Sequence, residues 1–206
     1  MELKMKSIKG MTLALLMLIA AMAGCIGTED ETTEEAEEEK AAFLDASDAG
    51  YTYASDVDNH RSLMQDLCDI KTAASDSNWD EAKNIYTNGK NAEKSDGSYR
   101  TLAGFAAAAG KNHNYDAFYG ADGSIGAHIM AAMDGTGDFA GASDTVRYQG
   151  IAKLTANMGM VGYTIHELNA AVAKADAGNT DNDSGAPHNW DEGWAFFHGP
   201  DEHWSC

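Results

Sequence analysis

A long apolar stripe in the C-terminal half of the chain constrains the fold more than any other sequence feature. Seven apolar residues recur there at alternating steps of three and four positions: Ile151, Leu154, Met158, Val161, Ile165, Leu168 and Val172. This spacing places them on one face of an amphipathic helix. We expect the helix to begin at Asp144, a candidate N-cap, and to end near Lys174, before the stop signal of Gly178.

The rest of the chain after residue 40 also favours helices over strands. A second amphipathic stripe covers 57–74, with Val57, Leu63, Leu67, Ile70 and Ala74 on one side. Shorter helices are predicted at 79–87, 99–109, 124–133 and 190–198, separated by stretches rich in Gly and Asp. The sequence contains two prolines and no run of alternating β-branched residues. The predicted fold class is therefore all-α, a bundle of packed helices.

One short motif occurs twice and suggests an internal duplication. The sequence Asn-Trp-Asp-Glu stands at 78–81 and again at 189–192, each time after a long amphipathic helix and a polar loop. We therefore expect a duplicated helix–loop–helix unit. The motif also fits a helix capping box, in which the asparagine binds the third backbone amide and the glutamate reaches back. For Glu81 and Glu192, a capping role and a ligand role are both open from the sequence.

The first 24 residues have the organisation of an export signal. Lys4, Lys6 and Lys9 precede an uncharged apolar stretch at 11–23, which is too short to span a membrane. An Ala-Gly pair directly before Cys25 resembles the cleavage site of prokaryotic lipoproteins, in which this cysteine is lipidated. Two acyl chains would anchor the protein stably to the membrane surface. The alternative is an ordinary signal peptide followed by an unmodified cysteine.

An acidic segment separates this signal from the folded region. Eight carboxylates and one lysine lie between Ile26 and Lys40, without an aromatic residue. Together with lipidated Cys25 we expect 25–40 to be a disordered, extended tether, either a spacer or a metal-scavenging tail. One all-helical domain is predicted over 41–206. Because an indole, Trp204, lies almost at the last residue, the sequence leaves open whether the chain is truncated at its C-terminus.

The net charge of −19 narrows the classes of partner. The chain has 33 acidic and 14 basic residues, so a nucleic acid is a poor partner because phosphates carry the same sign. Such a field favours cations, although adaptation to salty water would produce the same composition. After Cys25 only Cys68 and Cys206 remain, and an oxidising exterior would allow them to form one disulfide.

Histidines and carboxylates gather in three places that suit a metal ion. The densest group lies near the C-terminus and comprises His188, Asp191, Glu192, His198, Asp201, Glu202 and His203. The second is His166-Glu167, where Gly159 and Gly162 leave space for a ligand or, alternatively, for close helix packing. The third comprises His113, Asp116 and Tyr119, alternatively a loop packed on its own aromatics. Carboxylate oxygen and imidazole nitrogen are suitable ligands for iron and other divalent metals, whereas His60 lies on the apolar side of its helix and is expected to be structural.

Spacing excludes several classes of enzyme. Position 170, where a zinc protease with His166-Glu167 would have its second histidine, is alanine. The Glu-x-x-His pairs of a di-iron centre, the Gly-x-Ser-x-Gly motif and the phosphate loop do not occur in the sequence. We therefore expect no enzymatic activity. A hydrolase that uses Asp191 or Glu192 as a base is a weaker alternative, because no nucleophile is identifiable.

Several of these segments together resemble a known family. Arg-Tyr-Gln-Gly at 147–150, Gly-Tyr-Thr-Ile-His-Glu-Leu at 162–168 and His-Asn-Trp-Asp-Glu-Gly-Trp-Ala-Phe-Phe at 188–197 are similar to the low-iron-inducible periplasmic proteins of algal iron assimilation. The segments 85–91 and 100–105 fit the same pattern, so the resemblance covers roughly 78–206. It implies an extracytoplasmic protein that binds iron, with the ligands His166, Glu167, His188, Asp191 and Glu192. Additional candidate ligands are His113, Asp116, Tyr119, Asp80, Glu81 and His198.

The sequence therefore predicts a lipid-anchored protein at the cell surface or in the periplasm that captures iron. Ferric iron is favoured, and a divalent metal is the alternative. Its partners would be the metal ion, the membrane and an uptake transporter. The alternative function is a surface interaction or structural module that binds a protein or glycan without metal.

Overall fold

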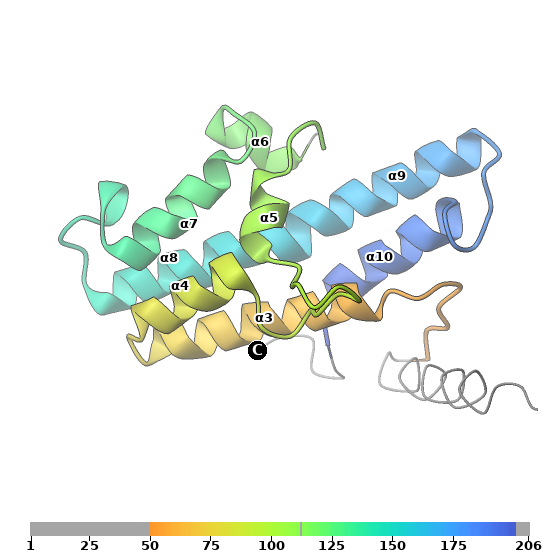
Figure 1. The fold of residues 1–206 in the computed structure, drawn as a ribbon. Coiled ribbons are helices and arrows are strands. Elements are labelled where there is room, and N and C mark those ends of the chain that lie inside the picture. Colours follow the sequence, from red (N-terminus) through yellow and green to blue (C-terminus); the bar gives the residue numbers. More distant parts are fainter. Residues whose placement is uncertain (1–49, 112, 201–206) are drawn as a thin grey trace, which may run out of the picture. The chain divides into compact units, whose positions relative to one another are not determined.

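The computed structural model describes residues 50–111 and 113–200, and these form a bundle of helices (Figure 1). The helices are α3 Asp58–Ser75, α4 Trp79–Asn88, α5 Leu102–Ala107, α6 Asn114–Tyr119, α7 Ser124–Asp134, η2 Gly137–Phe139, α8 Asp144–Ala156, η3 Asn157–Tyr163, α9 Thr164–Asp176 and α10 Ala186–His198. Within these two ranges the only extended pairing is an isolated bridge between Glu93 and Tyr99. The predicted all-α class is confirmed. The helices α6 and η2 were not predicted.

Several predictions concern residues outside the described ranges. The export signal, Cys25, the acidic tether and Cys206 all lie there. Cys68 is disulfide-bonded, but its pairing with Cys206 stays a prediction. Of the helices that are described, none has both the length and the apolar character needed to cross a bilayer.

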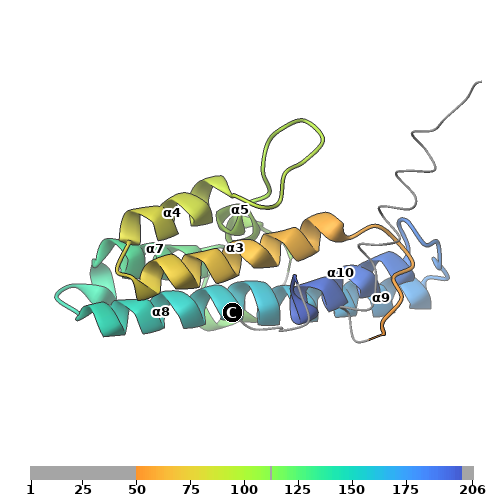
Figure 2. The same cartoon turned by 90° about the horizontal axis from the view of Figure 1, so that it is seen from below.

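The long helix expected from the apolar stripe is a continuous rod made of α8, η3 and α9 (Figure 2). It begins at Asp144 as expected, but the N-cap is Ser143 and not Asp144: the hydroxyl of Ser143 accepts a hydrogen bond from the amide of Val146. Its middle part, η3, is π-helical, a conformation that often occurs near functional sites. The stripe is buried only in part: Ile151 and Met158 are fully buried, whereas the C-terminal half of the stripe is largely exposed.

The glycines of η3 allow close packing rather than ligand space. A Cβ atom on Gly162 would lie 2.4 Å from Cε1 of Tyr115, and one on Gly159 would lie 3.3 Å from Cε of Met64. The missing side chains therefore let α6 and α3 approach the rod.

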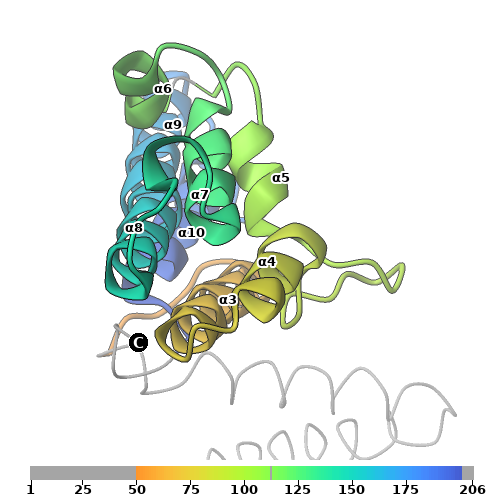
Figure 3. The same cartoon turned by 90° about the vertical axis from the view of Figure 1, so that its left-hand side faces the viewer.

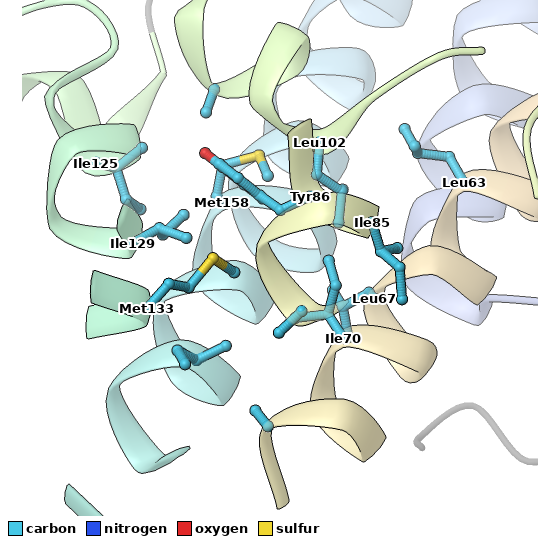
Figure 4. Packing of buried hydrophobic residues seen from close by; sticks show 14 of the residues in the cluster. Leu63, Leu67, Ile70, Ile85, Tyr86, Leu102, Ile125, Ile129, Met133 and Met158 are labelled. Atoms are coloured by element: carbon cyan, nitrogen blue, oxygen red, sulfur yellow. The ribbon is translucent and has the colours of Figure 1, made fainter. Parts of the chain in front are cut away.

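The main hydrophobic core lies between α3, α4, α5, α7, α8 and η3 (Figure 4). Its fully buried members include Leu63, Ile70, Tyr86, Leu102, Ile125, Ile129, Met133 and Met158. Burying aliphatic and aromatic side chains stabilises the bundle by roughly 1.5–3 kcal/mol for each. This core fixes the positions of α3, α5 and η3, from which three sides of the candidate site are built.

The two Asn-Trp-Asp-Glu copies both lie on the second helix of a helical hairpin, α3–α4 and α9–α10 (Figure 3). In α4, Asn78 is the N-cap and accepts from the amide of Glu81 at 3.4 Å. In α10, however, the helix begins at Ala186, with Gly185 as N-cap and proline in the first turn. Of the two roles that the sequence left open for Glu192, capping is therefore excluded. Because Asn189 and Glu192 lie inside the helix, their side chains are available for tertiary contacts.

Candidate functional site

A polar pocket opens between α3, α5, η3, α9 and α10, with a volume of about 770 Å³. Its titratable lining comprises His60, Tyr99, Arg100, Lys111, Tyr163, His166, Glu167, Lys174 and Glu192. The two acidic residues come from neighbouring helices of the α9–α10 hairpin. The pocket therefore combines carboxylates and imidazoles inside a chain whose surface is strongly acidic.

Glu192 lies at the centre of a cluster of hydrogen-bonding groups in this pocket. Its Oε1 is 3.3 Å from Nε2 of His60 and 3.2 Å from Nε2 of His188, one helical turn earlier. Its Oε2 accepts from Nδ2 of Asn189 at 3.4 Å, and the same Nδ2 donates to Oε2 of Glu167 at 2.5 Å. We call these five residues, His60, Glu167, His188, Asn189 and Glu192, the Glu192 cluster.

Burial makes the central contact of the cluster uncharged near neutral pH. Desolvation, and then the negative charge of Glu167, raise the pKa of Glu192 to about 8, although the positive charges of Arg100 and Lys174 oppose the shift. Desolvation, and then the positive charge of Arg100, lower the pKa of His60 to about 3. The contact between Glu192 and His60 is therefore a hydrogen bond between neutral groups rather than an ion pair.

The raised pKa of Glu192 predicts a loss of stability at alkaline pH. The folded state binds the proton more tightly than the unfolded state, so the free energy of unfolding falls as the pH rises from about 4.5 to about 8. His60 contributes a slope of the opposite sign that fades above about pH 7.5, where it is neutral in both states, and this contribution is common to the unchanged protein and Glu192→Gln. From pH 6.5 to 8.5 we expect the free energy of unfolding to fall by about 2 kcal/mol more in the unchanged protein than in the Glu192→Gln protein. Denaturant unfolding at both pH values measures this difference. Equal losses in the two proteins would contradict the raised pKa of Glu192.

His188 is held in one orientation by Ser55. The hydroxyl of Ser55 donates to Oδ2 of Asp191 at 3.0 Å and lies 2.8 Å from Nδ1 of His188. Because the proton of this hydroxyl is used in the hydrogen bond to Asp191, the hydroxyl oxygen accepts a hydrogen bond from Nδ1–H of His188. The lone pair of the imidazole is then on Nε2, which faces Glu192.

Four of the five main predicted ligands meet in or beside the pocket, and Asp191 does not. Nε2 of His166 lies 3.7 Å from Oε1 of Glu167, and His188 contacts Glu192. The buried carboxylate of Asp191 instead binds the segment that precedes α3. It accepts from the hydroxyl of Tyr51 at 2.6 Å, from the amides of Ala54 and Ser55 at 2.8 Å each, and from the Ser55 hydroxyl.

The additional candidate ligands are scattered. His113 is buried, and its ring centroid lies 5.2 Å from that of His166, while burial lowers its pKa. Tyr119 packs against His128 instead of joining His113 and Asp116. Exposed positions on α4 hold Asp80 and Glu81, and the buried ring of His198 stacks on Trp194 outside the pocket lining.

Sequence reasoning did not identify the roles of His60 and Arg100 in the pocket. His60 was expected to be structural, yet it lines the pocket and contacts Glu192. Arg100 was not singled out, although its charge acts on both His60 and Glu192. No local pattern connects positions 60 and 100 with position 192, so only the folded chain reveals their proximity.

The described residues do not form a ready-made metal site. Among residues 50–111 and 113–200, no group of three or more His, Cys, Asp or Glu side chains is arranged to hold a metal ion. Buried polar atoms of the cluster nevertheless have no hydrogen-bond partner within these ranges, namely Nδ1 of His60 and Oδ1 of Asn189. The side chains present thus have unused ligand capacity, but would have to rearrange to bind an ion.

Comparisons with known proteins identify the family. No curated protein and no solved structure matches the chain. The sequence profile of the low iron-inducible periplasmic proteins, however, matches residues 4–204, nearly the whole length. This agrees with the resemblance carried by the segments around His166 and Trp190, and the chain belongs to the low iron-inducible periplasmic protein family.

Proposed function

We propose that this protein binds iron outside the cytoplasm, using Glu167, Glu192, His60 and His188 of the Glu192 cluster as ligands. The observation that carries the proposal is the approach of two largely buried carboxylates, Glu167 and Glu192, to one amide of Asn189. Two imidazole Nε2 atoms lie against the same carboxylate. The family name, which refers to low iron and the periplasm, supports an iron-related role in that compartment.

The chemistry of these side chains suits iron. Desolvation, and then repulsion from the neighbouring carboxylate of Glu167, make Glu192 retain its proton. A bound cation would remove this repulsion and replace the proton. Carboxylate and imidazole together are ligands that iron accepts, and the ordered tautomer of His188 would present the Nε2 lone pair to it.

Binding requires a local rearrangement. The Nδ2 group of Asn189, which bridges the two carboxylates, would have to turn away from them. Turning the amide would bring its Oδ1 atom, which has no partner among the described residues, towards the ion. His166, beside Glu167, would be a further ligand within reach.

The biological role that we propose is capture and presentation. Acylation at Cys25 would hold the protein at the membrane, and the acidic surface would raise the local concentration of cations. Iron bound reversibly in the open pocket would pass to an uptake transporter. We propose binding without catalysis.

Calorimetric titration of the purified protein tests this proposal. We expect saturable binding of one iron ion per chain, measured for ferric and ferrous iron, with zinc and calcium as comparisons. Because Glu192 is protonated at pH 7, binding should release about one proton, detected as a dependence of the heat on the ionisation enthalpy of the buffer. Absence of binding for all four ions would reject the proposal and favour a module that binds a protein or glycan.

A further inference from the structure

The outer face of the α9–α10 hairpin, together with the end of η3 that precedes α9, exposes large apolar side chains. Val161 is 48% exposed, Ile165 42%, Val172 57% and Trp190 49%. Val161, Ile165 and Val172 are the C-terminal half of the stripe that the sequence places on one helix face. We call these four residues the apolar seam. Contiguous apolar surface of this kind marks interaction sites.

The seam and the pocket lie on opposite sides of the hairpin. Gly193 of α10 faces α9, because a Cβ atom there would lie 3.1 Å from a methyl group of Leu168. On the rod, Ile165 lies three residues before Leu168 and Val172 lies four residues after it. On α10, Trp190 lies three residues before Gly193. In two antiparallel helices, equal offsets from facing residues point to the same side.

The two glutamates of the Glu192 cluster point to the other side of the hairpin, where the pocket lies. Glu167 and Glu192 each lie one residue before their facing residue, Leu168 or Gly193, so they point to the other side of the hairpin. Their shared contact with Asn189 and their place in the pocket lining agree with this geometry. The seam is therefore turned away from the pocket opening.

The seam also lacks charge, in a chain with a net charge of −19. Between Val161 and Val172 the titratable side chains are Tyr163, His166 and Glu167, which all line the pocket. On α10, the carboxylate of Asp191 is buried against the segment 51–55. An uncharged apolar strip on such an acidic protein is suited to neutral lipid rather than to an anionic surface.

The N-terminal end of the described chain lies beside the seam. The ring of Tyr51 stacks on that of Trp194 with centroids 5.0 Å apart, and its hydroxyl donates to Asp191. The described chain therefore begins against α10, at Trp194, which lies one helical turn after Trp190 (Figure 1). An acyl anchor at Cys25 would hold this side of the protein near the bilayer at high effective concentration.

We infer that the apolar seam rests on the neutral lipid surface of the membrane and orients the pocket away from the bilayer. The inference rests on the membrane location in the proposed function, but not on iron binding. Tryptophan and branched aliphatic side chains partition into the interfacial region of a bilayer. Individually weak contacts suffice because the tether returns the domain to the surface.

Quenching of tryptophan fluorescence by brominated lipid tests the inference on the full chain. The protein is reconstituted into phosphatidylcholine vesicles with and without bromine on the acyl chains. We expect bromine-dependent quenching that is mostly lost in Trp190→Phe and retained in Trp79→Phe. Trp79 is the matched control because it lies on α4, against the guanidinium group of Arg147 at 4.1 Å.

A second measurement uses a chain without the anchor, Cys25→Ala. Val172→Glu should weaken its partitioning into phosphatidylcholine vesicles about tenfold, whereas Val146→Glu should not. Val146 is the control because it is 51% exposed on α8. Equal effects of the two substitutions would overturn the inference.

Acylation of Cys25 and lipid contact of the apolar seam can be tested independently. Mass spectrometry of Cys25 in the reconstituted sample reports acylation. Trp190-specific quenching without acylation supports the surface and rejects the anchor, whereas acylation without this quenching overturns the inference. A dimer in sedimentation analysis that Val172→Glu dissociates would also overturn it, because a second copy would then occupy the seam.

Discussion

Glu192→Gln is expected to lower the affinity for iron about 100-fold. The substitution keeps the shape of the side chain, but removes the carboxyl group that would give up its proton to bind the ion. Replacement of residues that only support a metal ligand costs roughly 10- to 100-fold in affinity, so loss of the central ligand should reach at least the upper end of this range. Calorimetric titration with iron at pH 7 measures the change.

The duplicated motif supplies a matched control for this substitution. Glu81 has the same sequence neighbours as Glu192 but lies exposed on α4. Glu81→Gln should therefore leave the affinity within about twofold of the unchanged protein. Glu167→Gln should act like Glu192→Gln, and the double substitution should be less than additive because both residues bind one ion. Equal affinities of the Glu192→Gln and Glu81→Gln proteins would contradict the proposed site.

Asp191→Ala is expected to lower the free energy of unfolding by about 3 kcal/mol. Two hydroxyls and two backbone amides donate to this buried carboxylate. Without it, the amides of Ala54 and Ser55 and the hydroxyl of Tyr51 would lose their partner, and unsatisfied buried groups cost roughly 1–3 kcal/mol each. Denaturant unfolding measures the loss, and Asp80→Ala, the equivalent change in the exposed copy, should cost less than about 0.5 kcal/mol.

The same substitution separates a positioning role of Asp191 from a ligand role. Through Ser55, Asp191 fixes the tautomer of His188, so its removal should weaken iron binding by about tenfold and not by 100-fold. A protein that keeps its stability but loses iron binding would restore Asp191 as a ligand. The family resemblance alone does not distinguish these roles, because it identifies residues and not the directions of their side chains.

The contrast between the two motif copies shows where prediction from sequence stopped. Identical residues at 78–81 and 189–192 left a capping role open for both copies, and only Asn78 caps its helix. Upstream, Gly185 and the following proline start α10 three residues before Asn189. The local start of the helix thus decided that Asn189 and Glu192 point into a pocket and do not cap a helix end.

The sequence by itself determined the helices and the class of chemistry, because periodicity and residue type are local properties of the chain. The stripes around 57–74 and 151–172 predicted the two longest helical segments, and the residues at 166–167 and 188–192 pointed to the two helices that supply the carboxylates. Only the tertiary structure decided which of these side chains meet. His60 joins Glu192 from 132 positions away, and Asp191 turns to Ser55, because helix packing sets side-chain direction and proximity, and neither is encoded in any short stretch of sequence.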